Sequence, residues 1–275
     1  MVKIPIKDEL IWALDHPLIT ELPRHYLGMS QIGEPCDRAL QYHFRWADET
    51  TINRRINRLF NFGKIAEEQM TEELERIGCR IDNQQKEYIG FAGHWKGHID
   101  GNITMVPGKD DLDVFLLEFK THNHKYFKQL KKEGVQNGYP KHYDQCQRYL
   151  SEDPTLAGCM YVGYNKDDSD FYIEFLDHDT GRQKDLKRKE QHIVLEDKLF
   201  PRIGTGQITW HECKMCNHQK VCYGRKEVRP SCRTCVHVEC EDEGGWRCSK
   251  HSKGLGLEFQ AKGCDDYELD EEYFE

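Results

Sequence analysis

The sequence lacks any long hydrophobic run. No apolar stretch approaches the roughly 20 residues that a membrane-spanning helix needs, and the mean hydropathy is −0.82. The residues from Met1 to Asp8 contain no continuous hydrophobic segment of the signal-peptide kind. Internal repeats and low-complexity linkers are missing as well. We therefore expect a soluble, cytoplasmic protein with no membrane partner.

Disulfide bonds are not expected either. The chain has 12 cysteines, and in a reducing compartment cysteines bind metals more often than they pair. Eight of the twelve cysteines follow Trp210. The length of 275 residues allows one large domain plus an appendage, or two domains. We expect a core over residues 1–226 and a small cysteine-rich module with an acidic tail over residues 227–275.

A general excess of positive charge is also missing, since the formal net charge is −9. Residues 265–275 carry seven acidic and no basic side chains, so −9 minus −7 leaves −2 for the rest. Between Lys120 and Arg148, seven Lys and Arg residues stand against two acidic ones, a local excess of +5. Such a segment could contact several phosphates, and an ordinary solvated helix face is the alternative.

What the sequence does contain is an alternation of helical and strand patterns. Apolar spacing predicts a helical lead-in over 10–28, a turn opening a helix at 30–38, and further helices at 54–77, 124–134, 140–152 and 183–199. Strand patterns fall at 86–94, 96–106, 113–121, 158–165 and 170–176. This order predicts an α/β fold with a small mixed sheet flanked by helices.

Two short apolar-flanked segments contain charged residues of catalytic type. One holds Asp100, and the other holds Glu118 and Lys120 on either side of Phe119. Alternate side chains of a strand share a face, so Glu118 and Lys120 point the same way. If the Asp100 strand pairs beside them, the carboxylates suit Mg²⁺ or Mn²⁺, and the lysine could position a water for phosphodiester hydrolysis. A Glu-x-Lys pair alone is also common as an exposed ion pair.

Glu67 lies on the apolar stripe of the predicted helix 54–77, between Gly63 and Met70. A carboxylate that faces a core is costly unless it is paired or binds a metal. The alternative is a glutamate at the edge of the stripe whose carboxylate reaches water.

The order of these residues resembles the PD-(D/E)xK nuclease superfamily. Glu67, Asp100 and Glu118-x-Lys120 are followed by Gln145-x-x-x-Tyr149. The similarity is to the branch of RecB-type nuclease domains, lambda-type exonucleases and CRISPR-associated adaptation nucleases, and it covers about residues 29–222. It implies a restriction-endonuclease-like core. Most RecB and CRISPR-type members have histidine where this chain has Glu67, so the pattern is nearer to the exonucleases.

The resemblance also implies roles for individual residues. Asp100, Glu118 and the Phe119 carbonyl would hold the metal, and Glu67 would bind a second metal or a coordinated water. Lys120 would orient the attacking water, and Gln145 would help to hold the scissile strand. Arg38, in Ser30-x-x-Gly33-x-x-Cys36-x-Arg38, and Tyr149 would contact DNA. For Arg38 a structural ion pair is an equal alternative.

The function implied is that of a divalent-metal-dependent DNA exonuclease in recombination, repair or phage DNA processing. Its partners would be DNA and recombination or replication proteins, in the host cytoplasm if a phage encodes the chain. One alternative is a non-catalytic zinc or iron–sulfur subunit that binds nucleic acid. Another is a restriction-type endonuclease with the same catalytic centre.

The cysteines form two sets. Cys213-x-x-Cys216 and Cys222 lack a fourth nearby cysteine, and the resemblance implies that Cys36 joins them around a [4Fe–4S] cluster. Zinc, with His211 or His218, is the alternative ligand arrangement. The second set predicts a structural zinc site, with His251 or Cys240 as a substitute for one ligand: Cys232, Cys235, Cys248 and Cys264. Small buried hydrophobic roles are expected for the remaining cysteines, Cys79, Cys146 and Cys159.

Overall fold

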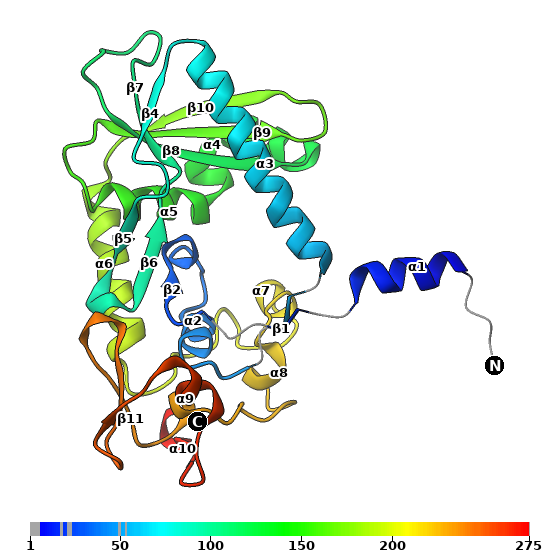
Figure 1. Ribbon diagram of the computed structural model, residues 1–275, viewed down its shortest axis with the longest axis vertical. Coiled ribbons are helices and arrows are strands. Elements are labelled where there is room, and N and C mark those ends of the chain that lie inside the picture. Colours follow the sequence, from blue (N-terminus) through cyan, green and yellow to red (C-terminus); the bar gives the residue numbers. More distant parts are fainter. Residues whose placement is uncertain (1–5, 17–18, 21–23, 49–50, 53, 275) are drawn as a thin grey trace.

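A five-stranded mixed sheet forms the centre of the chain (Figure 1). The structure is a computed structural model that describes residues 6–16, 19–20, 24–48, 51–52 and 54–274. The strand order is β10-β9-β8-β7-β4, in which β8 and β9 run parallel and the other neighbours run antiparallel. The strands are β4 (Arg80–Asp82), β7 (Gly101–Thr104), β8 (Phe115–His122), β9 (Gly158–Asn165) and β10 (Phe171–Leu176).

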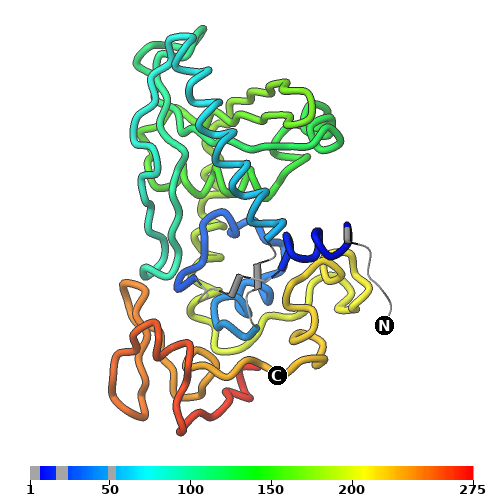
Figure 2. Tube along the Cα trace, turned by 45° about the vertical axis from the view of Figure 1, so that its right-hand side comes forward, coloured from blue at the N-terminus to red at the C-terminus, as the bar shows by residue number. Residues whose placement is uncertain are grey.

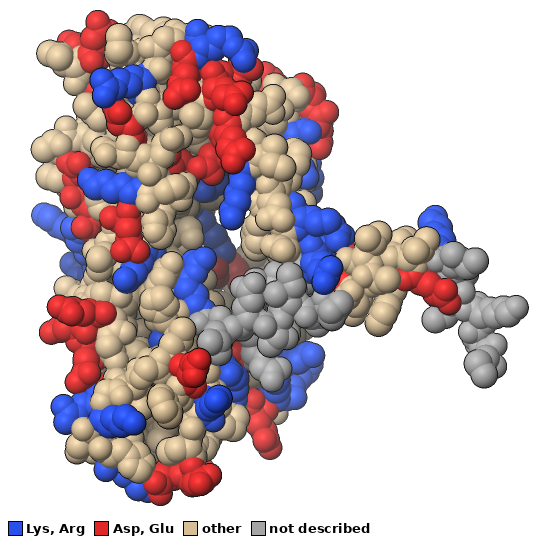
Figure 3. Space-filling model, viewed as in Figure 1, with Lys and Arg blue, Asp and Glu red and all other residues tan. Residues whose placement is uncertain are grey.

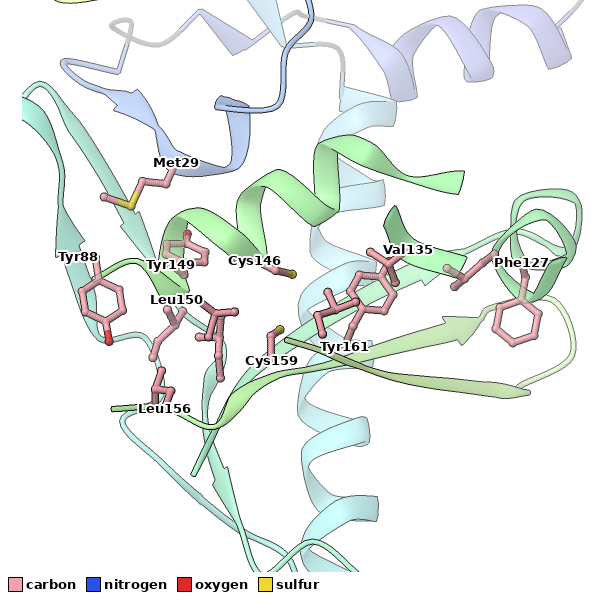
Figure 4. Packing of buried hydrophobic residues seen from close by; sticks show 14 residues of the cluster. Met29, Tyr88, Phe127, Val135, Cys146, Tyr149, Leu150, Leu156, Cys159 and Tyr161 are labelled. Carbon is pink, nitrogen blue, oxygen red and sulfur yellow. The ribbon is translucent and has the colours of Figure 1, made fainter. Parts of the chain in front are cut away.

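Helices cover both faces of this sheet. On one face α3 (Arg54–Arg76) packs Ala66, Met70 and Leu74 against apolar side chains that include Leu117 and Phe119. On the other face lie α4 (His124–Gly138) and α5 (Pro140–Leu150), as Figure 4 shows for Cys146 of α5 and Cys159 and Tyr161 of β9. The α/β architecture with a mixed sheet between helices is therefore confirmed.

The apolar stripe of α3 is buried only in part. Met70 and Leu74 of this stripe are buried, and Ile77, which follows the last residue of the helix, is 60 % exposed. Members of the stripe in the N-terminal half are exposed as well, at 44–59 % of their surface: Ile56, Leu59 and Phe60. Figure 1 shows the reason, because the N-terminal half of α3 extends beyond the sheet. The expectation of one continuous buried stripe was wrong for that half.

The expected strand over 96–106 is divided between two sheets. β6 (Trp95–His98) lies between β2 (Leu27–Gly28) and β5 (Glu87–Ile89), whereas β7 belongs to the central sheet. Between them, Ile99 exchanges backbone hydrogen bonds with Gln85 and Lys86, so the chain crosses from one sheet to the other at Asp100. The expected strand over 86–94 is likewise only β5, followed by a 3-10 turn over Phe91–Gly93.

The N-terminal lead-in is not a single helix. α1 (Ile6–Asp15) projects from the body (Figure 1), and Asp15 forms an ion pair with Arg58 of α3 at 2.7 Å. The helix ends two residues before Pro17 in the sequence, in keeping with the bias of a residue before proline against helical geometry. The short strands β1 (Ile19–Thr20) and β3 (Thr51–Ile52) pair with each other, and α2 (Asp37–Phe44) packs on α6 (Thr180–Leu195).

The residues after 200 form short elements below the central sheet (Figure 2). They are α7 (His211–Lys214), α8 (Gln219–Cys222), β11 (Val238–Cys240), β12 (Trp246–Cys248), β13 (Lys253–Gly254), α9 (Leu257–Lys262) and α10 (Glu271–Phe274). No helix in the described part of the chain is both long and apolar enough to cross a membrane.

These late elements pack on residues 24–48. Trp246 shares a buried cluster with Leu27, Phe44 and other residues of the body. The guanidinium of Arg233 lies 3.8 Å from the Trp46 ring centroid and 4.5 Å from that of Trp246, and it donates to the carbonyl of Phe44 at 2.9 Å. The division of the chain near residue 226 stays a prediction.

Candidate active site

Asp100, Glu118 and Lys120 lie together at the junction of β7 and β8. The Oδ2 atom of Asp100 accepts a hydrogen bond from the backbone N–H of Phe119 at 2.7 Å. The Glu118 side chain is 1 % exposed, and its Oε1 atom accepts hydrogen bonds from Lys120 Nζ and, at 2.8 Å, from Gln145 Nε2 of α5. The structure thus brings together four of the residues that the sequence predicts for the site.

The second oxygen of Glu118 is the unusual atom of this group. Glu118 Oε2 is buried and accepts no hydrogen bond from any residue that the structure describes. A buried carboxylate oxygen without a donor is costly, and such atoms are rare in folded proteins. A cation would satisfy this atom, because Mg²⁺ and Mn²⁺ take carboxylate oxygens as ligands.

The raised pKa values of the carboxylates also indicate that a positive charge would stabilise this site. Burial raises the pKa of Glu118 to about 7, and the charges of Asp100 and Glu67 contribute to the rise. Burial also raises the pKa of Asp100. Each carboxylate makes ionisation of the others harder, so a bound cation would stabilise the ionised forms.

Glu67 belongs to this electrostatic group although it lies on α3. Its side chain is half-buried, and its Oε1 atom accepts a hydrogen bond from Gln85 Nε2 at 3.2 Å. Burial, followed by the charge of Asp100, raises its pKa to about 7. The partial burial and the nearby carboxylates favour a role toward a metal over a carboxylate that simply reaches water.

Lys120 stays protonated at neutral pH. Burial alone would lower its pKa, but the carboxylates of Glu118 and Asp100 raise it overall. The lysine can therefore donate hydrogen bonds and supply positive charge, but it cannot act as a proton acceptor in this state.

A buried histidine–tyrosine group lies beside Lys120 and was not predicted. His122 Nε2 and His142 Nδ1 both contact the hydroxyl of Tyr161, at 3.0 and 2.9 Å. Burial and the charge of Lys120 lower the pKa of His122 to about 4 and that of His142 to about 3, so both are neutral. The two-residue period from Glu118 through Lys120 to His122 was the signal that could have indicated this group.

Two residues that were expected to contact DNA, Tyr149 and Arg38, are buried inside the protein. Tyr149 is 2 % exposed, and its hydroxyl donates to the His98 carbonyl at 3.0 Å, close to Gly97, where a Cβ atom would come within 2.5 Å of that hydroxyl. Tyr149 therefore supports the segment before Asp100, and any effect on DNA in this conformation is indirect. Arg38 is buried and donates to Tyr42 Oη and to the Phe200 carbonyl, so its contacts are structural, although neither partner is the carboxylate of the ion pair that was the alternative.

The basic segment after Lys120 contributes fewer surface charges than the sequence suggested. Arg148 is buried between Glu190 and Glu152, so it does not face solvent. Lys125, Lys128 and Lys132 are exposed on α4. Figure 3 shows Lys and Arg side chains at the edge of a hollow in the middle of one face.

The first cysteine set converges on one cavity of 710 Å³. Its lining includes Cys36, at the start of α2, together with Cys213, Cys216 and Cys222 from α7 and α8. Burial raises the pKa of the Cys36 thiol, and Cys222 and Cys213 add to this. His211 and His218 line the same cavity, so both the four-cysteine arrangement and the mixed cysteine–histidine arrangement fit the residues present.

The second cysteine set lines a small cavity near β12. Its four members occur together there: Cys232, Cys235, Cys248 and Cys264. Burial, and then Cys264, Cys235 and Cys248, raise the pKa of the Cys232 thiol to about 11. Among the described residues, the group whose ligand atoms all lie within 4.8 Å of one another is His251, Cys264 and Asp266, which contains one of the four predicted cysteines. Cys240 is not among the lining residues and instead pairs with Trp246 across β11 and β12.

The three remaining cysteines are buried, as expected of small hydrophobic residues: Cys79, Cys146 and Cys159.

No protein-family model matches this sequence, and no curated protein matches it. Several solved structures are similar to it. An alkaline exonuclease (LHK-Exo) from Laribacter hongkongensis has a TM-score of 0.45 and 14 % identity, over 63 % of this chain and 88 % of that one. The structure titled SSO0001 has a TM-score of 0.41 and 16 % identity, over 78 % and 91 %. LHK-Exo in complex with dAMP has a TM-score of 0.42 and 12 % identity, over 62 % and 87 %. With TM-scores below 0.5, these likenesses do not establish the chemistry of this chain.

Proposed function

We propose that this chain is a divalent-metal-dependent deoxyribonuclease, and more narrowly an exonuclease, that hydrolyses phosphodiester bonds. The observation that supports this best is the buried, donor-free Oε2 atom of Glu118. It lies in one electrostatic group with Asp100 and Glu67, beside a protonated lysine. Carboxylates can hold a divalent ion and a lysine can orient water, so these residue types suit metal-assisted phosphodiester hydrolysis.

The donor set fits Mg²⁺ or Mn²⁺. Glu118 Oε2 and the second oxygen of Asp100 would hold the ion, because their partner oxygens already accept hydrogen bonds within the protein. The N–H and C=O groups of an extended residue point to the same side of a strand, so the Phe119 carbonyl faces the same edge as Asp100. Glu67 would act on a second ion or a coordinated water. When bound, the ion supplies Lewis-acid stabilisation of charge on the phosphate and a more acidic water.

The protein side chains hold this arrangement in place. Gln145 and Lys120 both donate to Oε1 of Glu118, which fixes the carboxylate and directs Oε2 away from them. Gln145 is thus a positioning residue for Glu118 in addition to its expected role toward the scissile strand. Lys120 remains charged, so it would orient the attacking water and stabilise the phosphate rather than remove a proton.

The cysteine sets complete the proposal. A [4Fe–4S] cluster on Cys36, Cys213, Cys216 and Cys222 would join segments far apart in the sequence, with zinc as the alternative at that cavity. A structural Zn²⁺ on Cys232, Cys235, Cys248 and Cys264 would stabilise the C-terminal elements, with His251 as the substitute ligand. DNA would be the substrate, and recombination or replication proteins the partners.

Digestion of end-labelled DNA tests the activity. Single- and double-stranded oligonucleotides labelled at either end should be shortened with Mg²⁺ or Mn²⁺ and remain intact with EDTA. Asp100→Asn should abolish cleavage but preserve DNA binding, and Lys120→Ala should slow it by roughly 10²- to 10³-fold, as expected for the loss of a positioned charge-stabilising donor. Lys184→Ala, which alters an exposed lysine of α6, is the matched control and should cleave like the wild type.

Three results would contradict the proposal or its exonuclease part. Full cleavage by Asp100→Asn would remove the carboxylates from the mechanism, and full cleavage by Lys120→Ala would remove the lysine. Tight DNA binding without cleavage by the metal-loaded wild type would favour a non-catalytic nucleic-acid-binding subunit. Internal cuts before any shortening from an end would favour an endonuclease.

A further inference from the structure

A third pocket, separate from the two cavities that the cysteines line, lies at the C-terminal end of β8, two residues beyond Lys120. Its volume is 400 Å³, within the roughly 300–1,000 Å³ range of small-ligand pockets. Aromatic and apolar side chains from three parts of the chain line it: Leu59, Phe60 and Phe62 of α3, His122 of β8, and Tyr126 and Tyr139. Lys166 lines it as well.

The α3 wall of this pocket is exposed to an unusual degree. Phe60 is 59 % exposed, Leu59 50 % and Phe62 42 %, and Tyr126 on the facing wall is 48 % exposed. A contiguous patch of exposed apolar side chains on a folded protein often marks a binding surface. The half of the α3 stripe that the sheet leaves uncovered therefore coincides with one side of the pocket.

The opposite wall is ordered by its own contacts. The hydroxyl of Tyr139 donates to the Tyr126 carbonyl at 2.6 Å, and its ring lies edge-on to His122 with centroids 4.8 Å apart. Phenyl rings on one side and the Tyr139–His122 ring pair on the other suit a planar ligand.

Position and charge identify the kind of ligand. Residues of a strand advance by about 3.3 Å, so His122 lies roughly 7 Å along β8 from Lys120. A nucleotide next to a phosphate at the carboxylates could thus reach the pocket. Lys166 lines it, and Lys125 and Lys128 are exposed on the adjoining α4, which suits a polyanionic strand.

We propose that this pocket binds an unpaired base of the strand being cut, stacked against the aromatic rings of α3. The inference rests on the proposed nuclease function and narrows its substrate to single strands or unpaired ends. A base inside a duplex is stacked on both faces and cannot enter, whereas an unpaired base of any sequence offers a π-face.

Equilibrium binding in EDTA tests the pocket without cleavage. We compare Phe60→Ala, Phe62→Ala and the wild type by fluorescence anisotropy, with a labelled single-stranded DNA and an abasic strand of the same length. Stacking of one base predicts that each variant binds the ordinary strand roughly 5- to 150-fold more weakly. Affinity for the abasic strand should be unchanged. Phe259→Ala on α9, where the native ring is also 59 % exposed, is the matched control and should bind both strands like the wild type.

The outcomes separate this inference from the nuclease proposal. Wild-type affinity of both pocket variants for the ordinary strand, or an equal loss on the abasic strand or a blunt duplex, would refute base stacking. Failure of the wild type to bind single-stranded DNA would refute it too. If the wild type cleaves no DNA with Mg²⁺ or Mn²⁺, the nuclease proposal itself fails, whatever the binding data show. Thermal melting of each variant verifies that it is folded.

Discussion

Replacing Glu118 with glutamine should make the metal-free protein more stable at alkaline pH. The Glu118 side chain is 1 % exposed and its pKa is raised from 4.5 to about 7 by burial. The folded chain therefore holds this proton more tightly than the unfolded chain does, so stability falls as the pH rises from about 4.5 to about 7. Glutamine has nearly the same shape but no charge, so the variant lacks this loss.

The magnitude follows from the size of the pKa shift. A rise of 2.5 units, the difference between 4.5 and about 7, corresponds to about 3 kcal/mol at most. The pKa of about 7 already includes the hydrogen bond and the positive charge of Lys120, which both lower it, so this figure is a net one. We expect a gain of about 1 to 3 kcal/mol at pH 8 in EDTA, or roughly 2 to 12 °C in Tm. At pH 4, where Glu118 is neutral in both the folded and the unfolded chain, the gain should vanish or reverse.

Metal binding supplies the second half of the measurement. Mg²⁺ or Mn²⁺ at 100 times its Kd should stabilise the wild type by about 2.7 kcal/mol, and the variant should respond much less. Glu190→Gln is the matched control, because Glu190 is also 1 % exposed but both its oxygens bind Arg148, at 2.6 and 2.9 Å. Breaking that buried pair should cost roughly 3 to 5 kcal/mol at both pH values.

One pattern of thermal unfolding curves would contradict the prediction for Glu118→Gln. If Glu118→Gln melts below the wild type in EDTA at pH 8 and still gains the full stabilisation from metal, the unpartnered oxygen is not a metal ligand. Its buried charge would then also cost less than the structure indicates.

Three further predictions concern other parts of the molecule. Glu67→Gln should reduce the cleavage rate less than Asp100→Asn if Glu67 acts through water, and by as much if it is a direct ligand; single-turnover rates distinguish the two, and unaltered cleavage would exclude Glu67 from the site. Protein purified without oxygen should be brown and contain iron, and Cys213→Ala should lose both; colourless wild-type protein with about two zinc ions per chain by elemental analysis would instead assign zinc to that cavity. Trp246→Ala removes a side chain that is 1 % exposed between the two ends of the chain, so urea denaturation should show a loss of roughly 3 to 5 kcal/mol, and a change below 1 kcal/mol would mean that the C-terminal elements do not stabilise the body.

Much of the central sheet could be predicted from local pattern. The strand over 158–165 and the helix from Arg54 were visible because their apolar residues follow the period of the element. The same period placed Glu118 and Lys120 on one face, and the ion pair between them agrees with that. Such patterns report which side of an element is buried.

The pattern could not report which sheet an element joins. Residues 96–106 have a continuous strand pattern, yet hydrogen bonds from the turn at Gln85 and Lys86 move the chain to a second sheet before Asp100. The exposure of Phe60 has a similar cause, because the helical period continues past the edge of the sheet that could bury it. Gln85, which contacts Glu67, lies in a turn with positive φ and offered no periodic signal.

The position of Arg233 between Trp46 and Trp246 has a consequence for biosynthesis. A ribosome delivers Phe44 and Trp46 about two hundred residues before Trp246 and Arg233, which pack on them. During translation Phe44 and Trp46 therefore lack the contacts that Trp246 and Arg233 supply in the folded protein. We expect the central sheet to form first, while nascent chains that stall before Arg233 remain sensitive to proteases and chaperone-bound through the segment that holds Phe44 and Trp46.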